Sequence, residues 1–534
     1  MKRQYELTNW TFRIGDLDPA VEKEVTLPHT WNADPDPRLQ KFRGTGIYET
    51  TLPLAKIRNR SAVLRVGAAY HTANIYVNGR PAAYHTGCGY LPFEADITGY
   101  LEKGENRIRI DVDNTPKKEM LPHMLDFDWA DDGGLTRNVT LDVYEEMDFS
   151  GADIFYEVDL IHGGRASGRL FAIPDAEPQE YRVEVLDYQT GETVLTGGPD
   201  EDGVAELEFD DLSLWSLEDP HLYLVRILGE TDIFEKRIGF RTIEVEGTKV
   251  LLNGKPVYLK GCEWMPGSHP EYGMAETPEI SVRYLQKLRE AGCNFTRFHW
   301  QQDDLIYDWC DEHGLMVQEE IPYWGFPKTA TPLQQKIAED QAMNMIRCHG
   351  HHPSIVCWGV GNELNGAAPE TIWYVDRMVE LFKELDGSRL VNYVSNTLGL
   401  DENVDKDDAA LHGDIAMWNE YLGLWQPCDD VPGTVRRTAE KVGSMPFLVS
   451  EFGLCEPAFS GGDERRCEIL KQRLPLYKEI PNMCGYVYFC LNDYRTQMGE
   501  EGEGRLKRRV HGSTDLCGEE KPSYRLFREL QEKL

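Results

Sequence analysis

The sequence lacks the features that mark several protein classes. It contains no apolar run long enough to cross a bilayer, and its mean hydropathy is -0.49, so a membrane-spanning architecture is excluded. Basic residues are few, since 56 Lys and Arg against 91 Asp and Glu give a net charge of -35. Because so acidic a surface repels phosphate backbones and anionic lipids, we expect no nucleic-acid partner and no membrane partner.

The cysteines follow no pattern that indicates disulfides or zinc binding. There are 12, without a Cys-x-x-Cys pair or a regular spacing. Several lie inside apolar runs, such as Cys357 and Cys490, so we expect buried free thiols in a reducing compartment. The N-terminal segment MKRQYELTNWTFRIG has no apolar core of the kind found in signal peptides, and we therefore predict a cytoplasmic location.

One short segment offers side chains that commonly bind metals. RCHGHHPS contains Cys348, His349, His351 and His352, which crowd the end of a predicted helix and the loop after it. Histidines at such a helix end also pair with free carbonyl groups and with the helix dipole. We therefore predict a structural role for these residues and no metal.

The first half of the chain reads as two β-domains. A length of 534 residues predicts several domains. Residues 1–147 show short runs of alternating polarity separated by Gly, Asn and Pro, which predict a jelly-roll-like β-sandwich. Within them, Asn78-Gly79 predicts a type I′ hairpin. Residues 148–246 repeat the pattern over a shorter length and predict an immunoglobulin-like β-sandwich.

Residues 247–534 change to alternating strands and helices. Short apolar strands, hydrophobic on both faces, alternate with amphipathic helices, which is typical of a (β/α)8 TIM barrel with a parallel sheet. The predicted strands are VYLKGCEW, NFTRFHW, LMVQEEI, SIVCWGVG, RLVNYVS, DIAMWNEY, PFLVSEFG and CGYVYFCLND.

Charged and polar residues cluster where these predicted strands end. In such barrels the working residues lie at the C-terminal ends of strands. Glu363 and Glu451 directly end long apolar runs, and burying them is costly unless they are paired. If they lie about 5 Å apart, one carboxylate can attack an anomeric carbon while the other protonates the leaving oxygen. The other strand-end candidates are Glu263, Arg297, His299, Glu319, Glu320, Asn362, Asn419, Tyr421, Asn492 and Asp493.

The motifs resemble glycoside hydrolase family 2, the family of β-galactosidases, β-glucuronidases and β-mannosidases. LPHTWN and FRGTGIYET in the first domain resemble its sugar-binding domain. GNELNG resembles the Asn-Glu pair that carries the acid/base, here Asn362 and Glu363. PFLVSEFG resembles the nucleophile strand, here with Glu451. The resemblance implies an exo-acting, retaining β-glycosidase that forms a covalent glycosyl-enzyme intermediate and needs no organic cofactor.

The same resemblance implies a set of substrate contacts. RFHW places Arg297 and His299 on family positions, and Tyr421 in WNEYLGLW corresponds to a Tyr that hydrogen-bonds the nucleophile. Asp128 would reach from the first domain into the sugar site, unless it only caps a turn. Five tryptophans that follow strands either line the pocket or pack against the helices: Trp264, Trp300, Trp324, Trp418 and Trp425. Relatives usually assemble, so we expect a homo-oligomer, and the metal ligands of some family members have no match here.

Three departures from the family bear on the sugar. GCEWMPGSHPEYG replaces the usual Asn-Arg-His-Glu stretch, and Phe489 stands where a Trp platform is usual, though Phe can still stack on a sugar face. Arg509 and His511 occupy the positions of the Asn-x-Lys pair that grips the carboxylate in β-glucuronidases. We therefore expect a β-galactosidase by elimination. The alternatives are a β-glucuronidase or other β-uronidase that uses LKRR for the carboxylate, and a carbohydrate-binding protein without catalysis.

Overall fold

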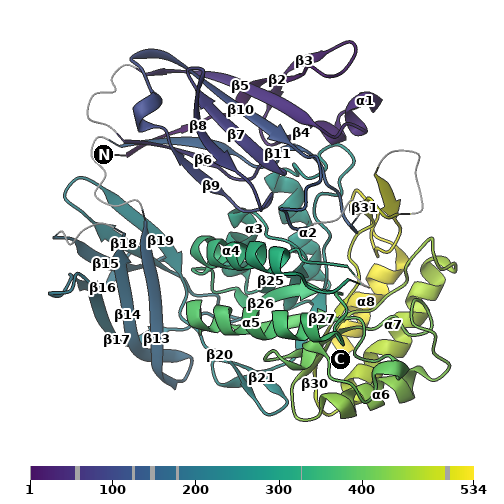
Figure 1. The fold of residues 1–534 in the computed structure, drawn as a ribbon. Helices are drawn as coiled ribbons and strands as arrows, with labels where there is room; N and C mark the ends of the chain where they lie inside the picture. Colours follow the sequence, from purple (N-terminus) through teal and green to yellow (C-terminus); the bar gives the residue numbers. More distant parts are fainter. Residues whose placement is uncertain are drawn as a thin grey trace.

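The computed structural model describes residues 2–54, 61–122, 127–144, 151–175, 180–325, 328–499 and 506–533. Two β-sandwiches pack beside a closed parallel barrel, as Figure 1 shows from the N-terminal sandwich in purple to the end of the barrel in yellow. The predicted order of two β-sandwiches followed by a TIM barrel is confirmed.

The N-terminal sandwich contains two main antiparallel sheets around a continuous apolar core. The larger sheet has the order β3(Val21–Thr26), β2(Asn9–Ile14), β5(Thr45–Leu54), β10(Gly104–Asp113), β7(Thr72–Val77) and β8(Arg80–His85). The smaller has the order β1(Lys2–Glu6), β12(Val139–Tyr144), β6(Ser61–Val66) and β9(Phe93–Asp96). Short elements complete it: β4(His29–Thr30) pairs with β11(Gly134–Leu135), beside η1(Trp31–Ala33), α1(Pro37–Gln40) and η2(Thr98–Tyr100).

Local sequence sets the pairing within this sandwich. Ile108, Ile110 and Val112 alternate with more exposed residues along β10, so one face of the strand enters the core. Asn78 and Gly79 have φ values of 52° and 78°, and they connect β7 to β8. Positive φ at both central residues is what a type I′ turn requires, so the hairpin prediction is confirmed.

The second sandwich also has two sheets with their own core. One contains β13(Ala152–His162), β14(Arg165–Pro174) and β17(Ala205–Ser213); the other contains β16(Thr193–Gly197), β15(Arg182–Asp187), β18(Tyr223–Leu228) and β19(Ile233–Ile238). The domain boundary expected at 147/148 lies outside the described residues. The boundary expected at 246/247 falls in a turn of a small sheet formed by β20(Ile243–Glu246), β21(Lys249–Leu252) and β22(Lys255–Val257).

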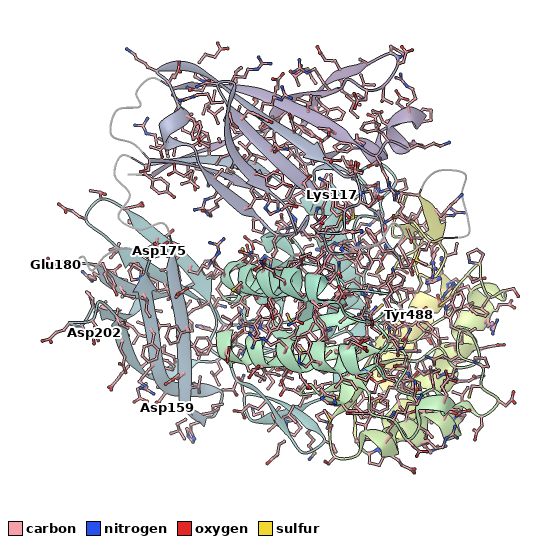
Figure 2. All side chains as sticks on the ribbon, in the orientation of Figure 1. Lys117, Asp159, Asp175, Glu180, Asp202 and Tyr488 are labelled. Atoms are coloured by element: carbon pink, nitrogen blue, oxygen red, sulfur yellow. The ribbon has the colours of Figure 1, made fainter. Side chains whose placement is uncertain are left out.

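The outer edge of this second sandwich carries part of the acidic surface that the net charge predicts. Figure 2 shows Glu180 and Asp202 on the side away from the barrel, with Asp175 at the upper end of the sandwich and Asp159 at its lower end. All four residues are exposed. The carboxylates therefore remain solvated, and they add to a surface that repels other anions.

The barrel closes through the parallel strands β23(Leu259–Cys262), β24(Phe295–Phe298), β25(Met316–Glu320), β26(Ile355–Asn362), β27(Leu390–Ser395), β28(Ala416–Asn419), β29(Phe447–Glu451) and β30(Met483–Tyr488). Its helices are α2(Pro278–Glu290), α3(Asp304–His313), α4(Pro332–His349), α5(Pro369–Leu385), α6(Val431–Val442), α7(Gly462–Glu479) and α8(Pro522–Lys533). The described residues between β27 and β28 form only the short η3(Asp401–Asn403) and η4(Ala409–Leu411). After β30, β31(Tyr494–Thr496) and β32(Lys507–Arg509) form a hairpin. No helix of the described residues has the length and apolar character needed to cross a membrane.

Helix boundaries follow local capping chemistry. Asp303 accepts a hydrogen bond from the backbone N–H of Leu305 at 3.0 Å and so caps α3. Gly314 ends the same helix in the left-handed conformation, with φ 63°. Gly292 follows α2 with φ 83°, as its position after the predicted helix indicates.

One buried arginine joins the second sandwich to the barrel. Arg241 is 1% exposed and donates hydrogen bonds to the carbonyl oxygens of Ser388, Ile355 and Pro353 at 2.7, 2.9 and 3.2 Å. Because carbonyl groups without donors are costly in the interior, this side chain satisfies three backbone acceptors at once.

We expect Arg241→Met to lower the midpoint temperature of thermal unfolding. The Met side chain fills much of the same volume but removes the donor to the carbonyls of Ser388 and Pro353, while the Ile355 carbonyl keeps Arg389 Nε at 2.8 Å. We expect a cost of about 2 kcal/mol or more. Arg226→Met is the matched control, since Arg226 forms a partly exposed ion pair with Glu235 at 2.6 Å, whose loss costs about 1 kcal/mol or less. Equal, small shifts for both variants in calorimetry would contradict this account.

Candidate active site

A cavity of about 400 Å³ opens beyond the C-terminal ends of the barrel strands. Most of the predicted site residues line it: Asp128, His299, Asn362, Glu363, Tyr421, Glu451, Trp425 and Phe489. Arg297 is different, because it is fully buried beneath the cavity and contacts the carboxylates above it. The barrel therefore brings these predicted residues together at one cavity.

Glu451 ends β29 and accepts a hydrogen bond on each carboxylate oxygen. Arg297 Nη1 donates to Oε1 at 2.9 Å, and the Tyr421 hydroxyl donates to Oε2 at 2.7 Å. Burial and the Glu451 charge raise the pKa of Tyr421 well above its usual value, so the phenol keeps its proton and remains a donor. Two donors on one carboxylate stabilise its charged form.

Glu363 follows β26 and has a different environment. Asn419 Nδ2 donates to its Oε1 at 2.8 Å, and Trp324 Nε1 donates to its Oε2 at 3.3 Å. Burial, together with the negative charge of Glu451, raises the pKa of Glu363 to about 7. Glu363 is therefore protonated below neutral pH while Glu451 is stabilised as the anion, and the two carboxylates can perform different proton chemistry.

The backbone around Glu363 is also unusual. Its φ is 54°, a left-handed conformation that a residue with a side chain rarely adopts. Asn419 holds the segment by donating to Asn362 Oδ1 at 3.1 Å, and Ser450 donates to Asn419 Oδ1 at 2.8 Å. Strained residues of this kind persist where surrounding contacts fix them, which is common in functional sites.

A buried charge cluster lies beneath the two glutamates. Arg297 donates to both oxygens of Glu320, at 3.2 Å from Nε and 3.1 Å from Nη2. Arg297 Nη1 also donates to Glu263 Oε2 at 3.3 Å, and His299 Nε2 lies 3.1 Å from Glu263 Oε1. Burial alone would raise the pKa of Glu320, but the positive charge of Arg297 and the contact with His299 lower it. Glu320 is thus an anion that holds the guanidinium in place.

The N-terminal sandwich supplies one wall of the cavity. Asp128 accepts hydrogen bonds from Thr496 at 2.9 Å and from Tyr494 at 3.1 Å, and its Oδ2 lies 3.1 Å from Arg509 Nη1. Burial raises the pKa of Asp128, although Arg509 opposes the effect. His511 lies next to this pair, 3.2 Å from the Tyr494 hydroxyl, and also lines the cavity. Asp128 therefore reaches the cavity from the first domain, as the family resemblance implies.

The tryptophans expected near the site divide into two groups. Trp324 and Trp425 line the cavity, and Trp425 is 50% exposed at its mouth. Trp264, Trp300 and Trp418 are buried in the barrel core instead, at 1% exposure or less. The two cavity tryptophans lie in the loops after β25 and β28, whereas Trp264 and Trp300 come two residues after β23 and β24 and Trp418 lies within β28.

Several residues that line the cavity are not among those predicted from the sequence. Trp129 stacks on His299 with ring centroids 5.6 Å apart and planes at 8°. Its position next to Asp128 was the available signal. The other additions, whose types carry no specific chemistry in a sequence, are Met265, Asn396, Thr397, Leu400, Gln426, Cys455 and Met498.

The described residues contain two groups that could hold a metal ion by spacing, but each already faces an arginine. Glu263, His299 and Glu451 form one group, and Arg297 donates to both of its carboxylates. A metal ion there would face the fixed positive charge of Arg297 at short range, which disfavours its binding.

The second group has the same difficulty. It consists of Asp308, Asp311 and His352, and Arg237 Nη2 lies 2.6 Å from Asp308 Oδ1.

Two of the three histidines of RCHGHHPS pair with carboxylates. His349 Nδ1 lies 2.7 Å from Glu319 Oε1, and His352 Nδ1 lies 2.6 Å from Asp311 Oδ2. Burial alone would lower the pKa of His349, but Glu319 and Asp304 raise it to about 9. These ion pairs connect the end of α4 to β25 and α3, which is a structural arrangement.

Comparisons with known proteins match two parts of the chain to one family. Residues 243–474 match the description "Glycosyl hydrolases family 2, TIM barrel domain", and residues 8–162 match "Glycosyl hydrolases family 2, sugar binding domain". A putative beta-glucuronidase of Formosa agariphila is 29% identical over 67% of this chain, and this chain spans 45% of its length. A beta-galactosidase of Thermoanaerobacterium thermosulfurigenes is 25% identical over 95% of this chain and 73% of its own.

Solved structures share the whole fold. A beta-D-glucuronidase of Dictyoglomus thermophilum has a TM-score of 0.88 at 23% identity, covering 100% of this chain and 97% of its own. A GH2 beta-galacturonidase of Eisenbergiella tayi bound to galacturonate has a TM-score of 0.84 at 23% identity, covering 100% and 98%. At these identities the likeness establishes the architecture.

We expect Glu363 to lose its proton near pH 7 and to do so at lower pH in Glu451→Gln. The substitution keeps the shape of the side chain but removes the charge that raises the pKa of Glu363, so the titration should move down by about one pH unit. Infrared difference spectroscopy of the protonated carboxyl band measures this, and Glu363→Gln identifies the band by its loss. An unchanged titration in Glu451→Gln would show that the two carboxylates are not coupled.

Proposed function

Because the chain belongs to glycosyl hydrolase family 2, we propose that it is a retaining exo-β-glycosidase that hydrolyses a terminal β-linked sugar in the barrel cavity. One observation carries the proposal. Glu451 accepts hydrogen bonds from Arg297 and Tyr421, whereas burial and the Glu451 charge raise the pKa of Glu363 to about 7. A nucleophile must be ionised and an acid must hold a proton, and this cavity provides one carboxylate of each kind.

In the first step Glu451 attacks the anomeric carbon. A bond forms between a Glu451 oxygen and C1 while the bond from C1 to the aglycone oxygen breaks, and Glu363 transfers its proton to that oxygen. The products are the free aglycone and a glycosyl ester of Glu451. Glu363 is then a carboxylate, and Glu451 has lost its negative charge.

The second step uses this change of charge. With Glu451 esterified, the charge that raises the pKa of Glu363 is gone, so Glu363 is more stable as the anion that a general base must be. Glu363 accepts a proton from water, the water oxygen bonds to C1, and the ester bond to Glu451 breaks. Both glutamates return to their starting states, and two displacements at C1 retain the configuration.

For the sugar itself we favour a β-uronide, a glucuronide or galacturonide. Arg509 lines the cavity beside Asp128, and a guanidinium suits a carboxylate because it offers paired N–H donors in one plane. This cation stands in a chain with a net charge of -35, where an anionic substrate needs a specific positive group to enter. Relatives named beta-glucuronidase and a fold neighbour named beta-galacturonidase support the same choice.

A β-galactoside, the sugar expected from the sequence, is the second candidate. Arg509 lies 3.1 Å from Asp128, so Asp128 compensates much of the positive charge that a uronate would use. A beta-galactosidase also covers 95% of this chain at 25% identity. In this alternative Asp128 accepts hydrogen bonds from sugar hydroxyl groups.

A panel of aryl β-glycosides tests the proposal. We expect the glucuronide or galacturonide to give the highest kcat/KM among glucuronide, galacturonide, galactoside, mannoside and glucoside. Arg509→Met should lower kcat/KM for the uronide by about 100-fold, because the sugar carboxylate is left without its cation. The galactoside value should change less.

Arg508→Met is the matched control. Arg508 is the adjacent residue of β32 and is exposed, so its removal should leave the uronide value unchanged. Preferred cleavage of the galactoside with no effect of Arg509→Met would establish the second candidate. No turnover of any glycoside would indicate a carbohydrate-binding protein and overturn the proposal.

A further inference from the structure

Glu263 is a buried carboxylate at the site that the two-step mechanism does not use. It follows β23 and is 0% exposed. Its Oε1 lies 3.1 Å from His299 Nε2, and Arg297 Nη1 donates to its Oε2 at 3.3 Å. A carboxylate in the interior is costly unless such partners compensate its charge.

Arg297 alone cannot compensate the carboxylates that face it. It bonds both oxygens of Glu320 at 3.1 and 3.2 Å and one oxygen of Glu451 at 2.9 Å, in addition to Glu263. Three carboxylates therefore surround one guanidinium. The excess negative charge in a buried cluster favours uptake of a proton.

His299 is the titratable side chain that lies nearest to Glu263, and Arg297 Nη2 lies 3.1 Å from the His299 Nδ1. Its Nε2 lies 3.1 Å from Glu263 Oε1 but 3.6 Å from Glu451 Oε1, and its Nδ1 lies 3.6 Å from Glu320 Oε1. The shortest carboxylate contact of the imidazole is thus with Glu263. The other ionisable groups that face Glu263 are the thiols of Cys262 and Cys490, and burial raises the pKa of each well above its usual value, so they stay neutral.

We propose that Glu263 is a positioning residue for Glu451, because it holds Arg297 beneath the nucleophilic carboxylate and places a negative charge beside His299. The role of Glu451 in this statement rests on the proposed function. Arg297 Nη1 bridges Glu263 and Glu451 at 3.3 and 2.9 Å, so Glu263 fixes the donor that Glu451 uses.

The arrangement has a consequence during the reaction. When Glu451 becomes an ester, Arg297 loses one of its anionic partners, while Glu263 and Glu320 keep the guanidinium in place for the second step. No proton moves between the cluster and the substrate. Burial raises the pKa of Glu263 to about 7, with His299 and Arg297 opposing this effect, so the charge of the pair changes within the neutral pH range.

The test is Glu263→Gln, which keeps the side-chain shape and removes the negative charge. Two properties of this variant are compared with the wild-type protein. One is the pH profile of kcat/KM on the aryl glycoside that the wild-type protein cleaves best, and the other is the titration of His299 by NMR with labelled histidine. The His299 signal is assigned from its loss in His299→Gln.

Glu276→Gln is the matched control. Glu276 is a half-buried carboxylate whose pKa is also raised to about 7 by loss of solvent, but it accepts hydrogen bonds from the backbone N–H groups of Ser268 and His269 at 3.0 and 3.1 Å. It has no contact with the charge cluster among the hydrogen bonds and ion pairs of the described residues. Its loss should move neither the profile nor the His299 titration.

We expect Glu263→Gln to lower the pKa of His299, because Glu263 is the carboxylate that most raises it against the effect of burial. The pH profile should move to lower pH by about half a unit or more, since one negative charge has left the cluster. A lower kcat/KM with an unmoved profile and an unmoved His299 titration would reduce Glu263 to packing and overturn the inference. If the wild-type protein cleaves no glycoside, the proposed function fails, and the His299 titration still decides whether the charge of Glu263 acts on His299.

Discussion

The ion pair between Arg297 and Glu451 is the interaction on which the rest of the site depends. Both side chains are buried, and their separation of 2.9 Å joins β24 to β29 across the barrel. A buried charge of either sign is costly alone, so each residue requires the other. The parallel barrel makes the pairing available, because it brings the C-terminal ends of strands that are distant in sequence to a single face.

Around this pair the barrel divides its glutamates by environment. Glu451 and Glu320 face Arg297, while Glu363 faces the amide of Asn419 and the indole of Trp324. Neutral donors compensate a charge less than a guanidinium does, so burial dominates at Glu363 and raises its pKa to about 7. One chemical group can therefore serve as an anion at one position and as an acid at another, without a cofactor to distinguish them.

The features that could be predicted from the sequence are those that short-range patterns determine. Strand and helix periodicity predicted the barrel, and the Asn78-Gly79 pair predicted its hairpin. The apolar runs before Glu363 and Glu451 predicted strand-end charges, of which Glu451 is buried and Glu363 is half-buried. The contacts that could not be predicted join distant segments, such as Asp128 with Arg509. In the sequence, Asp128 is indicated by the family resemblance and Arg509 by a departure from it, and nothing connects the two residues. Only the packing of the first sandwich on the barrel makes them neighbours.

Trapping the covalent intermediate tests the central claim most directly. With a 2-deoxy-2-fluoro aryl glycoside of the preferred sugar, fluorine at C2 destabilises the positive charge that develops at C1. Breakdown of the glycosyl ester is therefore slow enough for the ester to accumulate. The account predicts that the intact protein gains the mass of one fluorosugar and that peptide sequencing by mass spectrometry places it on Glu451. Attachment to any other residue, or turnover of the glycoside without a trapped ester, would contradict the assignment of Glu451 as the nucleophile.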